Sequence, residues 1–357
     1  MKIQENIPLA PLTTFRVGGP ARYLIDACSE SHINEALAFA ADKHLPLFVL
    51  GGGSNLVIAD EGWPGLVLKV GLKGVEFEFN RDSALFHARA GENWDDFVAL
   101  AVEHNCAGIE CLSGIPGTMG GTPVQNVGAY GQEVSQTIKT VRVLEIASGN
   151  VRDLSNQECG FSYRSSIFNR DACGKYIVLE VTFRLKQGGA PLLEYADLQR
   201  FFASEQKNPG LQQVRDAVRR IRQSKAMLLL PGDEDCRSAG SFFKNPIVSA
   251  EESLRIEKLA QRRASGLVLP RYLAKDGRVK LPAAWLVEQA GFHKGYSRGP
   301  VGISRKHSLA IVNRGGATAQ DIMALKNEIE QKVFDVWGVR LQPEPVFVGF
   351  HPHAKSS

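Results

Sequence analysis

The chain contains one long glycine-rich stretch that decides the fold, Gly114-Ile115-Pro116-Gly117-Thr118-Met119-Gly120-Gly121-Thr122-Pro123-Val124-Gln125-Asn126-Val127-Gly128-Ala129-Tyr130-Gly131. It has neither the period of a helix nor the alternation of a strand, so we expect an ordered loop. Ordering a loop of this length is unfavourable unless a ligand fills it. Its small residues would let the main chain wrap around a large, flat ligand with polar edges.

A second, shorter glycine segment is Gly51-Gly52-Gly53-Ser54-Asn55. It follows an expected strand and precedes another, so the helix that a Rossmann fingerprint needs is missing, as is the G-x-G-x-x-G spacing. A strand-to-strand glycine turn can still point successive backbone N–H groups at one anion, although a plain tight turn is the commoner meaning. Taken together, two such segments roughly sixty residues apart predict a dinucleotide held by backbone amides.

The hydrophobic pattern around these segments predicts an α+β fold. Strands are expected at 47–50, 56–58, 66–68, 141–146, 176–185 and 346–348. Two more strands are expected within 75–90, one on each side of a polar turn at 80–82. Helices are expected at 32–44, 94–102, 211–225, 250–264, 283–290 and 318–337, the last with Thr318 as N-cap. A turn is expected at Trp63-Pro64-Gly65. The tail 351–357 is expected to fray, with its two histidines in solvent.

Composition restricts the class of protein. The 357 residues are 44% hydrophobic and 22% charged, with a net charge of +4, which is typical of a globular protein. The mild basicity suits an anionic substrate, but without clustered Lys or Arg it does not predict nucleic-acid binding. No signal peptide or membrane span is expected, so we expect a cytoplasmic protein. Six scattered cysteines without a C-x-x-C pair predict reduced thiols, and dispersed histidines predict no metal site.

Several motifs resemble one family of proteins, the UDP-N-acetylenolpyruvoylglucosamine reductase (MurB) family of bacterial flavoenzymes. Besides the two glycine segments, the motifs are Leu12-Thr13-Thr14-Phe15-Arg16-Val17-Gly18-Gly19, Gly160-Phe161-Ser162-Tyr163-Arg164-Ser165-Ser166, Ala239-Gly240-Ser241-Phe242-Phe243-Lys244-Asn245-Pro246, Trp285-Leu286-Val287-Glu288-Gln289 and Pro343-Glu344. They occur in order over nearly the whole chain, which makes the resemblance highly specific. Pro345 departs from the commoner family pattern.

The resemblance implies an FAD-binding part with the vanillyl-alcohol-oxidase (PCMH-type) fold in two subdomains, at 1–70 and 71–205. A C-terminal α+β substrate-binding domain is implied at 206–341, and a last strand near 342–350 could return to the first half. The segment Leu193-Glu194-Tyr195-Ala196-Asp197-Leu198 resembles the insertion of the longer (type I) form, which carries a mobile tyrosine. A monomer is expected.

The implied reaction is a conjugate reduction. NADPH would give a hydride to FAD, which passes it to the enolpyruvyl group of UDP-N-acetylglucosamine enolpyruvate, yielding UDP-N-acetylmuramate for peptidoglycan synthesis. The family's role links the chain to cell wall biogenesis, cell shape and cell division. Because the turn at 51–55 holds no His or Cys, we expect FAD to be bound non-covalently.

The resemblance assigns three catalytic residues. Arg164 would bind the substrate carboxylate with a permanently charged fork, and Glu344 would carry or share a proton near the same oxygens. Ser241 would donate a proton to the enolate-like intermediate. Without the resemblance, Arg164 would be a surface arginine, Glu344 a loop residue between two prolines and Ser241 a turn cap. No G-x-S-x-G elbow surrounds Ser241, so a serine hydrolase is not indicated.

The same resemblance assigns binding residues. Those for the cofactor are Gly51, Gly52, Gly53, Ser54, Asn55, Gly114, Ile115, Pro116, Gly117, Thr118, Gly120, Gly128 and Tyr130. Those for the substrate are Tyr195, Lys225, Asn245, Tyr272 and Gln289. Arg222 and Lys225 share a helical face. A solvated basic face is the usual explanation for such residues, whereas the family pattern favours Lys225 as a contact for phosphate or the nicotinamide cofactor.

Two alternatives stay open at the level of sequence. An oxygen-using flavin oxidase on the same FAD scaffold predicts rapid reoxidation by air without NADPH. A nucleotide-sugar binding protein without redox function predicts a colourless protein that still binds the sugar nucleotide. A yellow colour after purification separates the second alternative from both flavoenzymes.

Overall fold

A computed structural model describes residues 1–203, 208–274 and 277–350 of the chain. The described chain forms two compact units. The first unit comprises 1–12, 20–54 and 62–229, and the second comprises 13–19, 55–61 and the residues from 230 onward. Each unit has its own hydrophobic core. The predicted fraying of the tail at 351–357 falls outside the described residues.

The first unit begins with a four-stranded sheet in the order β1 (Ile3–Pro8), β2 (Pro20–Ala27), β5 (Trp63–Val70), β3 (Leu47–Leu50). The last three strands run parallel. Helix α1 (Glu30–Asp42), capped by Ser29, follows β2 and buries Ile33, Ala36 and Ala40. A short 3-10 helix, η1 (Ala10–Leu12), separates β1 from β2.

The turn predicted at Trp63-Pro64-Gly65 is wrong, because these residues begin β5. The chain turns one step earlier, at 60–62. Gly65 serves close approach between neighbouring segments, since a Cβ there would lie 1.9 Å from the Pro46 oxygen. The Pro64-Gly65 pair, which suggests a turn by its local pattern, instead allows β5 to pack closely against Pro46.

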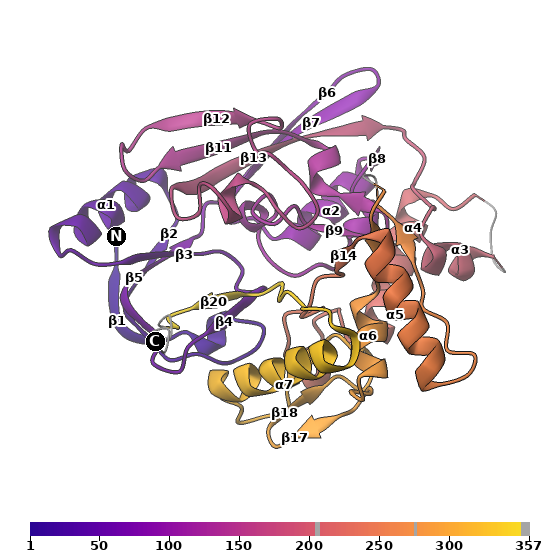
Figure 1. Ribbon diagram of the computed structural model, residues 1–357. Coiled ribbons are helices and arrows are strands. Elements are labelled where there is room, and N and C mark those ends of the chain that lie inside the picture. The colour runs from indigo at the N-terminus through magenta and orange to yellow at the C-terminus, as the bar shows by residue number, and fades with distance from the viewer. Residues whose placement is uncertain (204–207, 275–276, 351–357) are drawn as a thin grey trace. The chain divides into compact units, whose positions relative to one another are not determined.

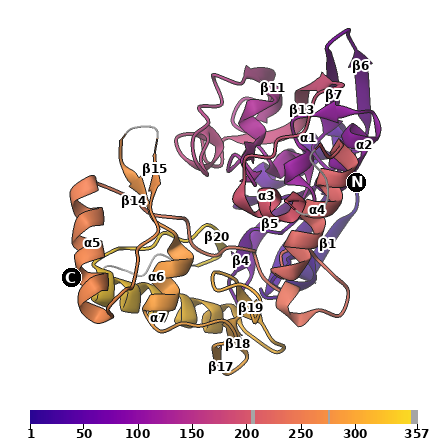
Figure 2. The ribbon, with the colours of Figure 1, turned by 90° about the vertical axis from the view of Figure 1, so that its right-hand side faces the viewer.

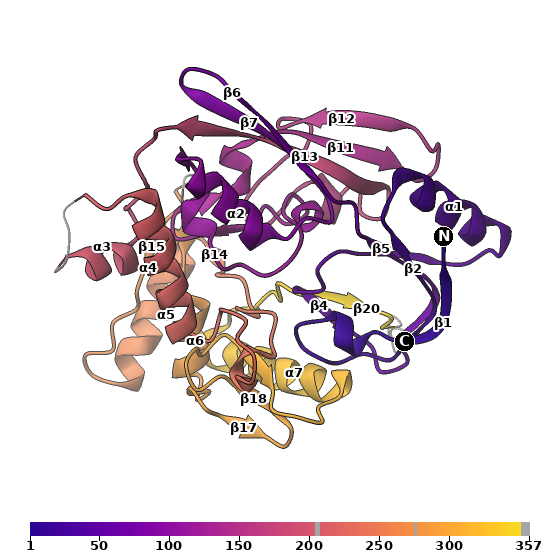
Figure 3. The same ribbon diagram turned by 180° about the vertical axis from the view of Figure 1, so that it is seen from behind.

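A second sheet of the first unit has the order β12 (Val151–Ser155), β11 (Ile138–Glu145), β13 (Tyr176–Gln187), β7 (Ser83–Arg89), β6 (Val75–Phe79), and β8 (Cys106–Ala107) adds to β13. All its pairings are antiparallel. Helix α2 (Trp94–Glu103) packs beside it in Figure 3. The ring centroid of Phe97 lies 5.7 Å from that of Phe86 and 5.2 Å from that of Phe183. These aromatic contacts pack the helix against the sheet.

The long glycine segment is an ordered loop, as predicted. Its short elements are η2 (Glu110–Leu112), η3 (Met119–Gly121), the ladder of β9 (Gly128–Ala129) with β10 (Gln132–Glu133), and η4 (Val134–Gln136). A further 3-10 turn, η5 (Ile167–Asn169), follows the Tyr-Arg motif. Helices α3 (Ala196–Phe202) and α4 (Leu211–Ser224) lie side by side (Figure 2) over a small core that includes Leu198 and Val214.

Over its described residues, the second unit is helix-rich and contains three small sheets. Its helices are η6 (Glu234–Cys236), α5 (Ala250–Arg263), α6 (Ala283–Gln289) and α7 (Ala319–Trp337). The sheets are β14 (Ile247–Val248) with β16 (Val279–Lys280) and β15 (Tyr272–Leu273), β17 (Ser297–Arg298) with β18 (Val301–Ile303) and β19 (Ile311–Asn313), and β20 (Val346–Val348) with β4 (Leu56–Ile58). The expected helices and strands are thus present, with ends that shift by a few residues.

Early and late parts of the chain meet in the second unit. Strand β4 pairs in parallel with β20, so the final predicted strand does return to a partner from the N-terminal half. The carboxylate of Asp60 accepts hydrogen bonds from the amides of Ala319 and Gln320 at 2.8 and 3.0 Å, a favourable place for negative charge at the start of α7. Thr318 caps the same helix, as predicted.

The described residues were also compared with the expectation of no membrane span and no metal site. Within them, no helix is both long and apolar enough to cross a membrane. In the same ranges, no group of three or more His, Cys, Asp or Glu side chains is arranged to hold a metal ion. None of the six cysteines, all of which lie in the described ranges, forms a disulfide, and four of them are buried.

Candidate active site

The two glycine segments of the first unit touch each other. The hydroxyl of Ser54 donates a hydrogen bond of 2.9 Å to the carbonyl of Pro116. A Cβ on Gly52 would lie 2.6 Å from the Cα of Gly117 and 2.9 Å from the nitrogen of Thr118. Gly117 has a φ of +130°, which side chains rarely adopt. Only glycine allows the two backbones this close, so the pairing inferred from sequence is realised in space.

The paired segments fit a phosphate-bearing ligand. Among the described residues, the backbone amides of Gly51, Gly52 and Gly53 donate no hydrogen bond within the protein. The Oγ1 atom of Thr118 is buried and has no hydrogen-bond partner in the same part of the chain. Buried polar groups are normally paired, and clustered amides form anion-binding concavities. The donors of this glycine cradle, which we define as 51–54 with 115–118, suit the pyrophosphate of a dinucleotide such as FAD.

The part of the long loop directly after the cradle is hydrogen-bonded to the protein itself. The amide of Met119 donates to the carbonyl of Glu92, and that of Gly120 to Ala90, both at 2.8 Å. A Cβ on Gly120 would lie 2.8 Å from the Cβ of Ala90. Gly120 therefore serves close packing of the loop, and its amide is already used.

Arg164 stands on a tight turn. Ser162 and Ser165 exchange backbone hydrogen bonds of 2.9 and 3.0 Å across it, and Arg164 has a φ of +53°, which is uncommon for a non-glycine residue. A Cβ on Gly128 would lie 3.3 Å from the Nη1 atom of Arg164. Asn126 donates to the carbonyl of Ser162 at 3.0 Å. The glycine loop therefore both leaves space for the guanidinium and supports its turn.

Three predicted binding residues gather beside the loop. The rings of Tyr130 and Tyr195 meet edge to face with centroids 5.3 Å apart, and the Lys225 ammonium lies 5.9 Å from the Tyr130 centroid. Lys225 Nζ also contacts Asp197 Oδ2 at 2.5 Å. Burial raises the pKa of Tyr130 to about 12, aided by Asp197 and opposed by Arg222. The phenol is therefore neutral over the physiological range.

The second unit brings Glu344 to the Ser241 motif. The amide of Glu344 donates to the carbonyl of Phe242 at 2.8 Å, directly after Ser241. Asn55 donates its side-chain amide to the Glu344 carbonyl at 3.2 Å, and the amide of Val346 donates to the Asn55 carbonyl at 2.9 Å. Ser241 and Glu344 are half-buried. The ladder resumes at Val346, immediately past Pro345, so the proline leaves the strand intact.

The other predicted substrate residues are positioned separately. The Oδ1 atom of Asn245 accepts the amide of Ala283 at 2.9 Å, at the start of α6. Tyr272 lies in β15 with 58% of its surface exposed, and Gln289 ends α6. The contacts that hold Asn55, Phe242 and Glu344 together involve neither Tyr272 nor Gln289. The structure thus groups Asn55, Ser241 and Glu344 but not Tyr272 and Gln289.

The sequence missed the partners of the basic helix face. Arg215 and Arg222 on α4 are each only 8% exposed, so a solvated basic face is the wrong explanation for them. Arg215 pairs with Asp95 and Lys225 pairs with Asp197. Asp197 could have been found, because it lies two residues beyond Tyr195 in the same motif. Asp95 has no such signal, since more than a hundred residues separate it from α4.

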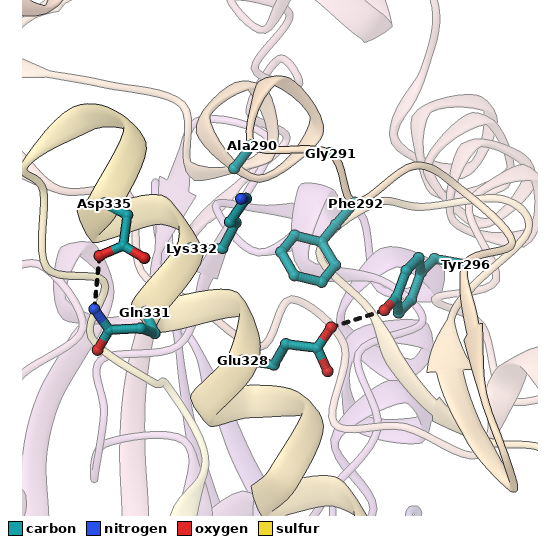
Figure 4. Close-up of a pocket in the computed structure, with 8 residues that line it drawn as sticks. All are labelled: Ala290, Gly291, Phe292, Tyr296, Glu328, Gln331, Lys332 and Asp335. Carbon is teal, nitrogen blue, oxygen red and sulfur yellow. Dashed lines mark hydrogen bonds between the residues drawn. The ribbon is translucent and has the colours of Figure 1, made fainter.

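Figure 4 shows a hollow in the second unit, between α7 and the segment that follows α6. Four of the polar side chains that line it form two pairs. Tyr296 donates to Glu328 at 2.8 Å, and Gln331 donates to Asp335 at 2.7 Å. The bond to Glu328 raises the pKa of Tyr296. The hollow contains none of the predicted site residues, and its internal pairing leaves little reason to assign it a ligand.

The fold and the cradle define the class of protein, an FAD-binding protein. A family model described as FAD binding domain matches residues 21–155. A second family model, described as the C-terminal domain of UDP-N-acetylenolpyruvoylglucosamine reductase, matches residues 231–348. The two matches account for the main parts of both halves of the chain.

Relatives extend this similarity over the whole length. The UDP-N-acetylenolpyruvoylglucosamine reductase of Thermobifida fusca (strain YX) is 47% identical, over 97% of this chain and 98% of the relative. The enzyme of the same name from Streptomyces coelicolor is 46% identical, over 97% of this chain and 91% of the relative. The chain belongs to the UDP-N-acetylenolpyruvoylglucosamine reductase (MurB) family.

A solved structure agrees with the expected fold. The crystal structure of UDP-N-acetylenolpyruvylglucosamine reductase (MurB) from Thermus caldophilus matches with a TM-score of 0.66 at 24% identity, covering 98% of this chain and 99% of that one. The expected α+β fold, with an FAD-binding part followed by a C-terminal domain, is confirmed.

Proposed function

We propose that this protein reduces the enolpyruvyl group of UDP-N-acetylglucosamine enolpyruvate to give UDP-N-acetylmuramate, a peptidoglycan precursor. The observation that carries the proposal is the contact between Gly52 and Gly117. It builds a dinucleotide cradle in a chain that matches these reductases over 97% of its length. Because the curated relatives are reductases, this function is favoured over a flavin oxidase.

The cradle residues 51–54 and 115–118 would hold FAD non-covalently through backbone amides and the Thr118 hydroxyl. When bound, FAD supplies hydride transfer, from NADPH to the vinyl carbon furthest from the substrate carboxylate. The chain's own task is then to bind the substrate, stabilise the charge that develops, and deliver one proton. The hydride and that proton together saturate the double bond.

Arg164 would bind the substrate carboxylate. Its tight turn defines the backbone at this position, and Gly128 leaves space for the guanidinium. A donor positioned in advance stabilises developing charge without reorganisation, which is usually the largest contribution to catalysis. Arg suits this role because its planar fork is permanently charged.

Ser241 would supply the proton to the carbon next to the carboxylate, and Glu344 would assist at the carboxylate oxygens. Both segments belong to one backbone ladder in the second unit, through the bond from Glu344 to Phe242. This ladder supports the proposal, because a weak acid such as a serine hydroxyl transfers a proton only when its geometry is tightly held.

Lys225 would contact the phosphates or the nicotinamide cofactor. The residues that would contact the sugar-nucleotide substrate are Tyr195, Asn245, Tyr272 and Gln289. We assign flavin binding to residues 1–70 and 71–205, and substrate binding chiefly to 206–341. The protein would act as a monomer in the cytoplasm. Its product would serve cell wall biogenesis, and through it cell shape and division.

An assay of the purified protein tests this function. We expect a yellow protein that oxidises NADPH only when the enolpyruvyl sugar nucleotide is present, under air or under argon alike. Loss of NADPH without substrate, or reoxidation that requires oxygen, would indicate an oxidase. A colourless protein that still binds the sugar nucleotide, even after incubation with FAD, would indicate a binding protein without redox function.

A further inference from the structure

Gly114 begins the flavin-facing part of the long loop, and both of its backbone groups are held by side chains. Its amide donates to Asp95 Oδ1 at 2.6 Å, and its carbonyl accepts from Arg222 Nε at 3.1 Å. Gly114 has a φ of +71°. A Cβ there would lie 2.9 Å from Leu228. The chain therefore enters the cradle at Ile115 from one defined direction.

Asp95 is itself held by helix α4. Arg215 Nη1 contacts Asp95 Oδ1 at 2.6 Å, and Arg219 Nη1 contacts Asp95 Oδ2. Asp95 also lies in the first turn of α2, where a negative charge is favourable. Burial raises the pKa of this carboxyl, but the bonds from Arg215 and Gly114 and the charge of Arg219 outweigh burial and lower it. The carboxylate is therefore ionised, and its contacts are charge-assisted.

We propose that Asp95 and Arg222 are positioning residues that clamp Gly114 from both sides and thereby set the geometry of the FAD-binding loop. Asp95 links α4 to the Gly114 amide, because it contacts Arg215 and Arg219 and accepts the Gly114 hydrogen bond. Arg222 donates directly to the Gly114 carbonyl. Arg222 also donates to the carbonyl of Met227 at 2.6 Å, two residues beyond Lys225. The same helix thus supports the flavin loop and the basic residue proposed for substrate binding.

This inference rests on the proposed function, because it assumes that the loop holds FAD. It is tested by the affinity of the apoprotein for FAD, measured by quenching of flavin fluorescence, in Asp95→Asn. We expect the dissociation constant to rise about 10- to 100-fold, as for a lost charge-assisted hydrogen bond. Asp96→Asn is the matched control, because Asp96 is the next residue on α2 and is exposed. Its FAD affinity should equal that of the wild type.

Two further variants separate positioning from stability. Asp95→Asn leaves Arg215 and Arg219 without their shared anion, so the double variant Asp95→Asn/Arg219→Gln should regain thermal stability while its FAD affinity stays low. Arg222→Lys keeps a charge but loses the Nε–H bond to Gly114, and it should also weaken FAD binding. If Asp95→Asn does not fold, Arg222→Lys and the double variant decide the question.

The outcomes are distinct. Unchanged FAD affinity in Asp95→Asn and in Arg222→Lys overturns the inference, while the proposed function stands if the wild type binds FAD. FAD affinity that recovers together with thermal stability in the double variant also overturns it, because the effect would then be one of folding. A wild-type chain that binds no FAD overturns the proposed function, and the inference with it.

Discussion

The ammonium of Lys225 and the carboxylate of Asp197 form an ion pair with 2.5 Å between Nζ and Oδ2, beside the edge-to-face rings of Tyr130 and Tyr195. Arg200 contacts the same carboxylate. The cation proposed to bind the phosphates is therefore neutralised within the protein when no ligand is present. An incoming phosphate must compete with Asp197, which comes from the same motif as Tyr195.

Removal of this competing charge should strengthen substrate binding. Asp197→Asn is expected to tighten the binding of UDP about threefold to tenfold, a range that suits a partly exposed ion pair. Isothermal titration calorimetry with UDP measures the effect. Asp216→Asn on the exposed side of α4 is the control and should change nothing. Weaker binding in Asp197→Asn would mean that Asp197 orients Lys225 for the ligand.

Loss of the proposed proton donor should affect one half-reaction only. Ser241→Ala is expected to leave the reduction of bound flavin by NADPH nearly intact and to slow reoxidation by the enolpyruvyl substrate by about two orders of magnitude or more, as for a lost general acid. Stopped-flow absorbance follows both steps. Ser249→Ala, which removes the N-cap of α5, should lower stability but leave reoxidation unchanged. Equal slowing of both half-reactions would contradict the role of Ser241.

The proposed carboxylate ligand should matter for turnover more than for flavin retention. Arg164→Ala is expected to lower kcat/KM for the enolpyruvyl substrate by about a hundredfold or more, while the purified protein stays yellow. Steady-state kinetics and the ratio of flavin to protein absorbance report the two effects. Arg152→Ala, in an exposed pair with Glu158, is the control. An Arg164→Ala protein that purifies without FAD would instead make Arg164 part of the cradle.

The contact between the glycine segments should not tolerate a methyl group. Gly52→Ala places a Cβ 2.6 Å from the Cα of Gly117, so the two backbones must separate, at about 1–3 kcal/mol for such overpacking. We expect FAD affinity to fall about tenfold or more, measured by fluorescence quenching. Gly121→Ala meets nothing within 4 Å and should bind FAD normally. Equal affinity in both variants would show that the segments can part freely.

The buried phenol of Tyr130 should make stability fall at high pH. Burial raises its pKa from 10.0 in the unfolded chain to about 12 in the folded protein. The folded state thus favours the neutral phenol, and the stability this provides is complete below pH 10 and is lost as pH rises through about 12. Urea unfolding across this range should show a smaller decline for Tyr130→Phe than for the wild type. Tyr23→Phe, on β2, should decline like the wild type.

Much of the fold was accessible from local sequence patterns. Periodic apolar positions predicted the helices at 319–337 and 211–224 almost to the residue, because amphipathic helices place their buried side chains at regular spacing. Local patterns were wrong at Trp63, which begins a strand where a turn was expected, and they did not indicate β1, β2 or α3. Gly65 is required in β5 because a Cβ would clash with the Pro46 oxygen. Pro46 is distant along the chain, so the local pattern could not reveal this contact.

The sequence by itself predicted that two glycine segments bind one ligand, and its ordered motifs determined the enzyme family. These are properties of short stretches, which keep their meaning wherever they lie. Only the tertiary structure decided that Asp95 accepts a hydrogen bond from the Gly114 amide and that Asp197 forms an ion pair with Lys225. It also decided that Arg215 and Arg222 of α4 are buried. Such partners are separated by tens of residues along the chain, and packing alone brings their charges within bonding distance.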